Sequence, residues 1–176
     1  IIDMAHANQQ RVRCYISCAV ACPYSGPTAA STLHDLTARL MDLGIDDFDF
    51  SDTIGVALPI DIHKLFDAID NLISPEELIL HLHNTNEKAL DCAKAAMECG
   101  VWKFDASCGG LGGCPYAPGA AGNLATEDLV QMACDLGIQT GVDLNQLIKS
   151  TSIIADALQC TMPSKVYNKA IDSQGE

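Results

Sequence analysis

The sequence predicts an α/β protein that is built on a parallel sheet. Four short β-rich runs are each followed by a segment with apolar residues at helical spacing. The connections are short, and no linker or low-complexity tract divides the 176 residues. Strands and helices that alternate in this way are typical of βαβ units. Four units fit either a small doubly wound domain or half of a (β/α)8 barrel, which needs about 250 residues.

Four strands are predicted from runs that are rich in β-branched, aromatic and other apolar residues. They cover residues 12–20, 46–56, 77–84 and 101–110, and the second run alternates with a period of two. Polar residues lie in or at the ends of these strands: Tyr15, Ser17, Asp52, His81, His83, Asp105 and Ser107. Active sites of barrels and of open parallel sheets gather at the carboxyl ends of strands. We therefore expect a site there.

The helices are predicted from apolar spacing and from the residues at their ends. Gly44 and Gly100 follow two of the helices, as glycine often does. Pro59 suits the start of a third, and Thr126 is expected to be the N-cap of another, with acidic residues next to it. The expected ranges are 29–44, 59–73, 86–100, 126–137, 143–158 and 163–172.

Composition and charge exclude several classes of partner. The net charge of −13 repels phosphate, so we expect no nucleic acid and no anionic membrane as a partner. No stretch approaches the roughly 18 apolar residues of a membrane helix. The first residues, IIDMAHANQQ, lack an initiator Met and the features of a secretory signal, and they read as the end of a helix followed by a loop. We expect the chain to begin within a longer protein.

The chain has nine cysteines, which is an odd number. They occur in apolar strand-like or helical settings such as RCYISCAVAC and ALDCAKAAMEC. The sequence therefore favours buried, reduced thiols in a reducing compartment over a disulfide framework.

Two histidines give the strand at 77–84 a possible chemical role. Alternate side chains of a strand share a face, so the leucines at 78, 80 and 82 should pack under helices. His81 and His83 then project together from the other face near the end of the strand. Imidazole is the commonest metal ligand. The pair fits a chelating site and, equally, two polar residues at a strand end.

The remaining candidates are Asp52 and the segment 107–123. Asp52 precedes a turn and could be a ligand, a base or, as its position alone favours, a structural cap. The segment is rich in glycine but matches no phosphate-binding pattern, and Cys108 and Cys114 lack the second pair of a zinc finger. A cysteine on such a loop suits acid–base work near a metal. The amide oxygen of Asn123 suits a hard cation.

Four motifs resemble the 3-hydroxy-3-methylglutaryl-CoA lyase family, in the order found along the chain. They are CYISCAVACPY, SDTIGV, GGLGGCPYAPGAAGNLATEDLV and LGIQTGVDL. The resemblance implies an α/β fold of the (β/α)8 TIM-barrel type, in which residues 1–176 supply strands five to eight and the C-terminal helices. The N-terminal part of the barrel would then be missing from the chain. It also implies a divalent cation, Mg²⁺ or Mn²⁺.

The resemblance assigns roles to particular residues. His81 and His83 match the two metal-binding histidines of the family, and Asn123 matches its asparagine ligand. Cys114 matches the catalytic cysteine of the glycine loop. Asp52 matches the aspartate of the Asp-Thr-Ile-Gly turn, and Tyr15 matches a residue near the substrate. His81 and Asp52 are therefore expected to be catalytic together with Cys114.

The implied reaction cleaves 3-hydroxy-3-methylglutaryl-CoA to acetyl-CoA and acetoacetate, in ketone-body formation or leucine degradation. The metal would acidify the 3-hydroxyl group, and a base near His81 and Asp52 would take its proton. Cys114, or a water that it positions, would then protonate the enolate carbon. The expected partner is an acyl-CoA, and the intact protein is expected to be a homodimer. Two alternatives remain open: a Claisen-condensing acyltransferase similar to isopropylmalate synthase, and a half-barrel without catalytic activity.

Three departures from the family pattern bear on these expectations. The Arg-Asp pair of the family's first strand has no counterpart in the chain. Asn84 stands where an aspartate is more usual, which should change a partner of the metal-binding histidines. Asp49 replaces a small neutral residue and adds charge near the site. The expected location is the bacterial cytoplasm or the mitochondrial matrix, with any targeting region outside this chain.

Overall fold

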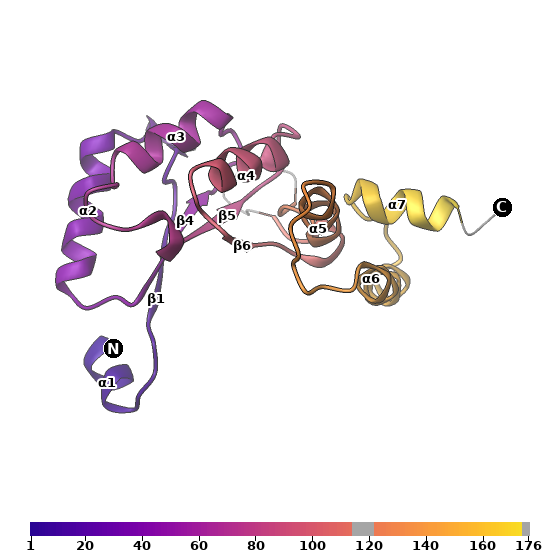
Figure 1. The fold of residues 1–176 in the computed structure, drawn as a ribbon, viewed down its shortest axis with the longest axis horizontal. Helices are drawn as coiled ribbons and strands as arrows, with labels where there is room; N and C mark the ends of the chain where they lie inside the picture. Colours follow the sequence, from indigo (N-terminus) through magenta and orange to yellow (C-terminus); the bar gives the residue numbers. More distant parts are fainter. Residues whose placement is uncertain (114–121, 174–176) are drawn as a thin grey trace.

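A four-stranded parallel sheet forms the centre of the protein (Figure 1). The computed structural model describes residues 1–113 and 122–173. The strands are β1 (Arg13–Ile16), β4 (Asp47–Asp52), β5 (Leu78–Leu82) and β6 (Lys103–Asp105). They are hydrogen-bonded in the order β1-β4-β5-β6, with every pair parallel. Strand order thus follows chain order, as successive βαβ units require.

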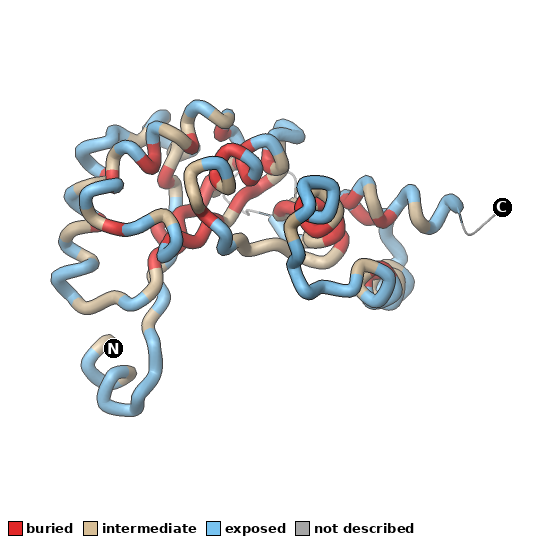
Figure 2. The backbone as a smooth tube through the Cα atoms, in the orientation of Figure 1, coloured by how far each residue is buried: buried red, intermediate tan, exposed pale blue. Residues whose placement is uncertain are grey.

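Three helices cover one face of this sheet (Figure 1). They are α2 (Ala30–Asp42), α3 (Pro59–Asp67) and α4 (Ala89–Glu98). Their apolar faces pack on the strands in one continuous core, which Figure 2 shows as the buried part of the sheet and of the helices above it. All three helices lie within the ranges that apolar spacing predicts.

Side-chain alternation in β5 separates the two faces as the sequence predicts. Leu78, Leu80 and Leu82 are each 1% exposed and belong to the core beneath the helices. His81 points to the opposite face and is only half-buried. The neighbouring strand β4 is buried almost throughout, because it pairs with a strand on each side. Its period-two pattern therefore decides which face a residue lines and not whether the residue is exposed.

The remaining elements extend from the sheet at its two ends. α5 (Thr126–Asp135), α6 (Leu144–Leu158) and α7 (Lys165–Asp172) follow β6. Leu129 and Met132 of α5 pack against the main core, whereas α6 and α7 form a second, smaller apolar cluster around Ile148, Met162 and Tyr167. The other elements are α1 (Ile2–Ala7), a short antiparallel hairpin of β2 (Ala21–Cys22) and β3 (Gly26–Pro27), and the 3-10 turns η1 (Pro75–Glu77) and η2 (Cys108–Gly110). The helix-then-loop reading of the first residues is confirmed.

Two local predictions are wrong. Thr126 is the first residue of α5 and Ala125 is its N-cap. The amide of Thr126 donates to the carbonyl of Ser107 at 2.9 Å, and Ser107 forms an isolated bridge with Ala125, so the helix starts one residue earlier than predicted.

Most cysteines are not buried either. Of the eight that the structure describes, only Cys92 is buried, and Cys134 and Cys160 are exposed. None of the eight forms a disulfide, which agrees with the prediction of reduced thiols. None of the helices in the described residues is long and apolar enough to cross a membrane.

Candidate active site

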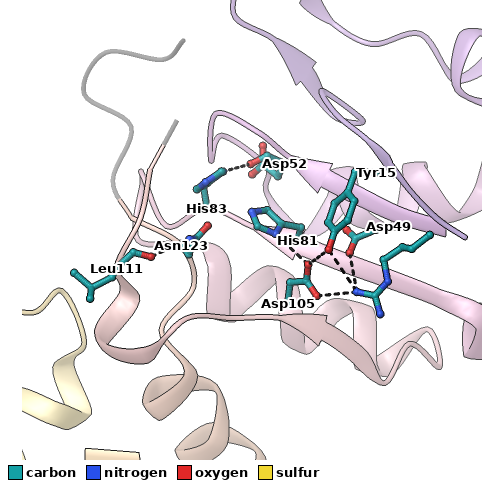
Figure 3. Close-up of polar contacts among 9 residues, drawn as sticks. Tyr15, Asp49, Asp52, His81, His83, Asp105, Leu111 and Asn123 are labelled. Carbon is teal, nitrogen blue, oxygen red and sulfur yellow. Dashed lines mark hydrogen bonds and ion pairs between the residues drawn. The ribbon is translucent and has the colours of Figure 1, made fainter. Parts of the chain in front are cut away.

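Polar residues from separate strands meet at the carboxyl ends of β4 and β5 (Figure 3). Asp52 is the last residue of β4, and His83 follows the last residue of β5. Asn123 lies far along the chain but forms an isolated bridge with His83. The amide of Leu124 extends this pairing by bonding the carbonyl of Leu82 at 2.9 Å. The backbone therefore fixes Asn123 beside the second histidine.

The two predicted metal-binding histidines lie next to each other. The centroids of the His81 and His83 rings are 5.1 Å apart, with the rings nearly perpendicular. Nδ1 of His83 lies 3.2 Å from the carbonyl oxygen of Asp52. Burial lowers the pKa of His83, which favours the neutral, ligating form of the ring. A hydrogen bond from one ring nitrogen to a carbonyl is the usual way to orient a ligating histidine.

His81 has an equivalent partner that the sequence analysis did not include in the site. Its Nδ1 lies 3.4 Å from Oδ2 of Asp105 at the end of β6. The same carboxylate accepts the hydroxyl of Tyr15 at 3.0 Å and an Arg13 nitrogen at 3.3 Å. Asp105 thus links His81 to the predicted substrate-binding tyrosine. The prediction had noted Asp105 only as a polar residue near a strand end.

Asn123 presents an acceptor that has no partner. Its Nδ2 donates to the carbonyl of Leu111 at 2.9 Å, which fixes the orientation of the amide. Its Oδ1 is buried and accepts no hydrogen bond from the described residues. Gly112 has a φ of +104°, and a Cβ at that position would collide with Nδ2 of Asn123. The glycine-rich segment is therefore shaped to let the backbone approach this side chain closely.

Two acidic residues, the buried Asp49 and the half-buried Asp105, lie on the same face of the sheet. Asp49 is fully buried, and neither of its oxygens has a hydrogen-bond partner among the described residues. The nearest cation is Arg13, at 3.8 Å. Burial, followed by the charge of Asp105 and a hydrogen bond with it, raises the pKa of Asp49 to about 7. A hydrogen bond between two ionised carboxylates is impossible, because neither carries a hydrogen. The bond between Asp49 and Asp105 therefore requires a proton on Asp49, and without that proton the two Asp49 oxygens have no partner.

Asp52 makes local contacts that fit its structural reading. Oδ1 accepts the amide of Val56 at 3.2 Å, and Oδ2 accepts the amide of Ala57 at 2.9 Å. Burial raises the pKa of Asp52, and these two amides oppose the rise. The carboxylate thus holds the turn after β4, while the backbone carbonyl of the same residue orients His83. A catalytic role for the carboxylate stays a prediction.

The structure brings together five of the six predicted site residues. They are Tyr15, Asp52, His81, His83 and Asn123 (Figure 3). Cys114 lies outside the described residues. Oδ1 of Asn84 accepts a hydrogen bond from the amide of Ala89 at the start of α4. Among the described residues, the side chain of Asn84 has no hydrogen bond to a histidine. No group of three or more His, Cys, Asp or Glu residues that could hold a metal occurs in the described residues.

The sequence analysis gives Arg13 no role in the site, although a sequence pattern points to it, and it names Asp49 only as an added charge near the site. Arg13 and Tyr15 are two apart on one strand and therefore share a face. Asp49 sits three residues before the predicted Asp52, on the strand next to β1. Their meeting with Asp105 depends on strand order, which the sequence leaves open. Two histidine nitrogens and one amide oxygen remain the natural donors for a divalent cation at this site.

Comparison with known proteins identifies the family. The family model described as HMGL-like matches residues 1–154. The mitochondrial hydroxymethylglutaryl-CoA lyase of Bos taurus is 40% identical over 94% of this chain and 51% of its own length. The cytoplasmic 3-hydroxy-3-methylglutaryl-CoA lyase of Rattus norvegicus is 37% identical over the whole chain and 51% of its own length. The chain thus spans about half the length of the curated relatives it matches.

A solved structure agrees with this assignment. An HMG-CoA lyase from Acinetobacter baumannii, in complex with coenzyme A and 3-methylmalate, superposes with a TM-score of 0.89 at 36% identity. The match covers 95% of this chain and 54% of that one. The parallel sheet and its helices are therefore part of a TIM barrel, as the sequence predicts. On both lines of evidence, the chain belongs to the HMGL-like family.

Proposed function

We propose that this chain is the C-terminal half of the barrel of a lyase that cleaves 3-hydroxy-3-methylglutaryl-CoA to acetyl-CoA and acetoacetate. One observation carries the proposal: His81, His83 and the unpartnered Oδ1 of Asn123 lie together at the carboxyl ends of the strands. The relatives named as HMG-CoA lyases, one of them solved with coenzyme A, support an acyl-CoA substrate. Mitochondrial and cytoplasmic relatives support either location.

The residues present fit a Mg²⁺ or Mn²⁺ ion. Because the Nδ1 atoms of His81 and His83 contact Asp105 and the Asp52 carbonyl, the Nε2 atoms are left as ligands. The buried Oδ1 of Asn123 needs a partner, and a hard cation would satisfy it. When bound, the ion would supply Lewis acidity toward the oxygens of the substrate. A further ligand would come from the part of the barrel that this chain does not supply.

The chain's own residues would position the substrate and move its protons. Tyr15 is half-exposed on the face shared with His81, where it can contact an acyl group. The proton of the 3-hydroxyl group would leave to a base beside His81 and Asp52, after which the C–C bond breaks and a thioester enolate remains. Cys114, from the glycine-rich segment, or a water that it positions, would protonate the enolate carbon. The complete enzyme is proposed to be a homodimer.

Acetoacetate release is the test of this function. The chain should be inactive alone, because the proposal gives it only part of the barrel. Fused behind the N-terminal half of a full-length relative, it should release acetoacetate from 3-hydroxy-3-methylglutaryl-CoA in the presence of Mn²⁺. A fusion that folds and binds Mn²⁺ but turns over no substrate would contradict the proposal. Turnover by the isolated chain at the rate of the fusion would contradict the half-barrel assignment.

The metal site has its own test in a matched pair of variants. Asn123→Ala should weaken Mn²⁺ binding to the fusion by at least about tenfold. The control is Asn145→Ala, which changes an exposed asparagine near the start of α6 and should leave binding unchanged. Equal Mn²⁺ affinity in the two variants, measured by electron paramagnetic resonance, would remove Asn123 from the site.

A further inference from the structure

Ser107 is a polar residue beyond the end of β6 that the proposed function does not use. Its backbone is fixed on both sides, because its amide donates to the carbonyl of Leu124 at 3.0 Å and its carbonyl accepts the amide of Thr126 at 2.9 Å. The amide of Leu124 in turn donates to the carbonyl of Leu82. The segment that carries Asn123 is therefore held between the ends of β5 and β6.

The hydroxyl of Ser107 reaches the same acceptor as the side chain of Asn123. Oγ of Ser107 donates to the carbonyl of Leu111 at 2.5 Å. Nδ2 of Asn123 donates to this carbonyl at 2.9 Å, as Figure 3 shows. A backbone carbonyl has two lone pairs, so the two donors fill its capacity to accept hydrogen bonds. Leu111 thus joins Ser107 to Asn123.

The backbone around Leu111 needs a restraint from outside. Its two neighbours, Gly110 and Gly112, have φ values of +77° and +104°. Glycine has access to more backbone conformations than any other residue, so the chain alone does not fix the direction of the carbonyl between them. The hydroxyl of Ser107 supplies that restraint from a backbone position that is already fixed.

The direction of the Leu111 carbonyl decides which end of the Asn123 amide is free. A carbonyl accepts hydrogen bonds and cannot donate them, so it selects Nδ2 and leaves Oδ1 as the other end. Oδ1 is buried and has no hydrogen-bond partner among the described residues. If the amide turned by about 180°, it would present an NH₂ group, which cannot bind a cation.

We infer that Ser107 is a positioning residue for the metal site: its hydroxyl holds the Leu111 carbonyl, which orients Asn123 so that Oδ1 is free for a divalent cation. The inference rests on the proposed site of His81, His83 and Asn123. Ser107 acts through Leu111 and is not itself a ligand. Hydrogen-bonding partners of metal ligands commonly tune metal affinity in this way.

Proton exchange at the side-chain amide of Asn123 tests the contact without any metal. In the full chain, nuclear magnetic resonance should show slower exchange with solvent for the Nδ2 protons of Asn123 than for those of the exposed Asn145. Ser107→Ala should remove this protection, whereas Ser107→Thr, which keeps a hydroxyl, should retain it. Unchanged protection in Ser107→Ala would overturn the inference.

Ser152→Ala is the matched control for both measurements. Ser152 is half-buried like Ser107, and its Oγ also donates to a carbonyl four residues away, at 3.1 Å. The control variant should leave the exchange at Asn123 and the affinity for Mn²⁺ unchanged. A control that loses as much as Ser107→Ala would overturn a specific role for Ser107.

A double-mutant cycle on Mn²⁺ affinity tests what the contact is for. In the fusion that carries the whole chain, Ser107→Ala should weaken Mn²⁺ binding by about tenfold, and Ser107→Thr should not. In Asn123→Ala, the added Ser107→Ala change should cost nothing more, because no amide remains to be oriented. A serine that only supports the fold would cost the same in both backgrounds.

That equal cost, or an unchanged affinity in Ser107→Ala alone, would overturn the inference. If the unmodified fusion binds no Mn²⁺, the proposed metal site fails and the inference fails with it. Proton exchange separates the two failures, because it reports the bond between Asn123 and Leu111 whether or not a metal binds.

Discussion

The two faces of the sheet are built on different principles. The helix-covered face is apolar and continuous, and its strand side chains pack in a single core with α2, α3 and α4. The opposite face carries charged and polar side chains, and one of them, Asp49, is fully buried. They are Arg13, Tyr15, Asp49, His81 and Asp105. Burying a charged group in a core costs free energy that an apolar side chain would not cost. We therefore propose that the polar face serves chemistry, whereas the helix-covered face serves stability.

The difference predicts that the same kind of substitution acts differently on the two sides. A change on the apolar face should alter the free energy of unfolding and leave metal binding intact. A change on the polar face or in its loop should alter activity or pH dependence first. Four variants, taken from the largest expected effect to the smallest, can break or sharpen this comparison.

The largest effect is expected from Cys114→Ala. In an active fusion that contains this chain, kcat should fall by about 10²–10⁴-fold, the usual contribution of an acid–base group. Mn²⁺ affinity should stay unchanged, because Cys114 is not a proposed ligand. Cys134→Ala, at an exposed cysteine of α5, is the control. A kcat close to that of the unmodified fusion, or a large loss of Mn²⁺ binding, would show that the role assigned to Cys114 is wrong.

Leu80→Ala tests the apolar face. Leu80 is 1% exposed in the middle of β5, and removing such a side chain costs about 2–5 kcal/mol of unfolding free energy. Leu36→Ala, at an exposed position of α2, should cost less than about 0.5 kcal/mol. Urea unfolding of the fusion measures both values. Equal costs for the two leucines would mean that the helix-covered face is not the stabilising core.

Asp49→Asn tests the pair of acidic residues through pH. Because the pKa of Asp49 is raised to about 7, the folded state holds its proton more tightly than the unfolded state does. Its contribution to stability is therefore present below about pH 4 and is lost as the pH rises through about 7. Asparagine carries no charge, so the variant should gain on the order of 2 kcal/mol relative to the unmodified protein between pH 5 and pH 8.

The same pH series on Asp42→Asn supplies the comparison, because Asp42 is exposed at the end of α2. The difference between Asp42→Asn and the unmodified protein should not change across this range. If Asp49→Asn behaves in the same way, the carboxyl of Asp49 is ionised at neutral pH and the raised pKa is wrong.

The smallest effect is expected from Tyr15→Phe. The change removes one hydroxyl, which donates to Asp105 at 3.0 Å on a half-exposed side chain. A hydrogen bond of this kind contributes about 1 kcal/mol or less. In an active fusion we also expect KM for the acyl-CoA to rise, since Tyr15 is assigned to the substrate. A stability loss well above this value with an unchanged KM would make Tyr15 a structural residue.

The sequence predicts what is decided by neighbouring residues. Alternation within residues 78–83 is enough to separate the leucines from the histidines, because side-chain direction in a strand is a local property. The turn after Asp52 is similarly local, since its carboxylate bonds amides four and five residues away. The TIM-barrel assignment came from motifs in their order and not from periodicity, which left two sheet architectures open.

What the sequence could not predict depends on long-range contacts. Asp105 joins the site because β6 lies next to β5, and its contact with Tyr15 spans 90 residues. Helix α5 begins one residue earlier than predicted because the carbonyl of Ser107 accepts a hydrogen bond from the amide of Thr126. Cysteine burial was wrong because apolar neighbours in sequence do not fix the depth of a residue in the fold. The first two of these errors concern partners that are distant in the sequence, and the third concerns depth in the fold, which is also set by long-range packing.

The central claim is that His81 and His83 are metal ligands on the polar face. Pulsed electron paramagnetic resonance of the fusion with bound Mn²⁺ detects histidine nitrogens that coordinate the ion directly. We predict nitrogen couplings from two imidazoles, reduced to one in His81→Ala and in His83→Ala and unchanged in His34→Ala, whose histidine lies on α2. Mn²⁺ that binds without any imidazole coupling, or with couplings that both variants leave intact, would contradict the account.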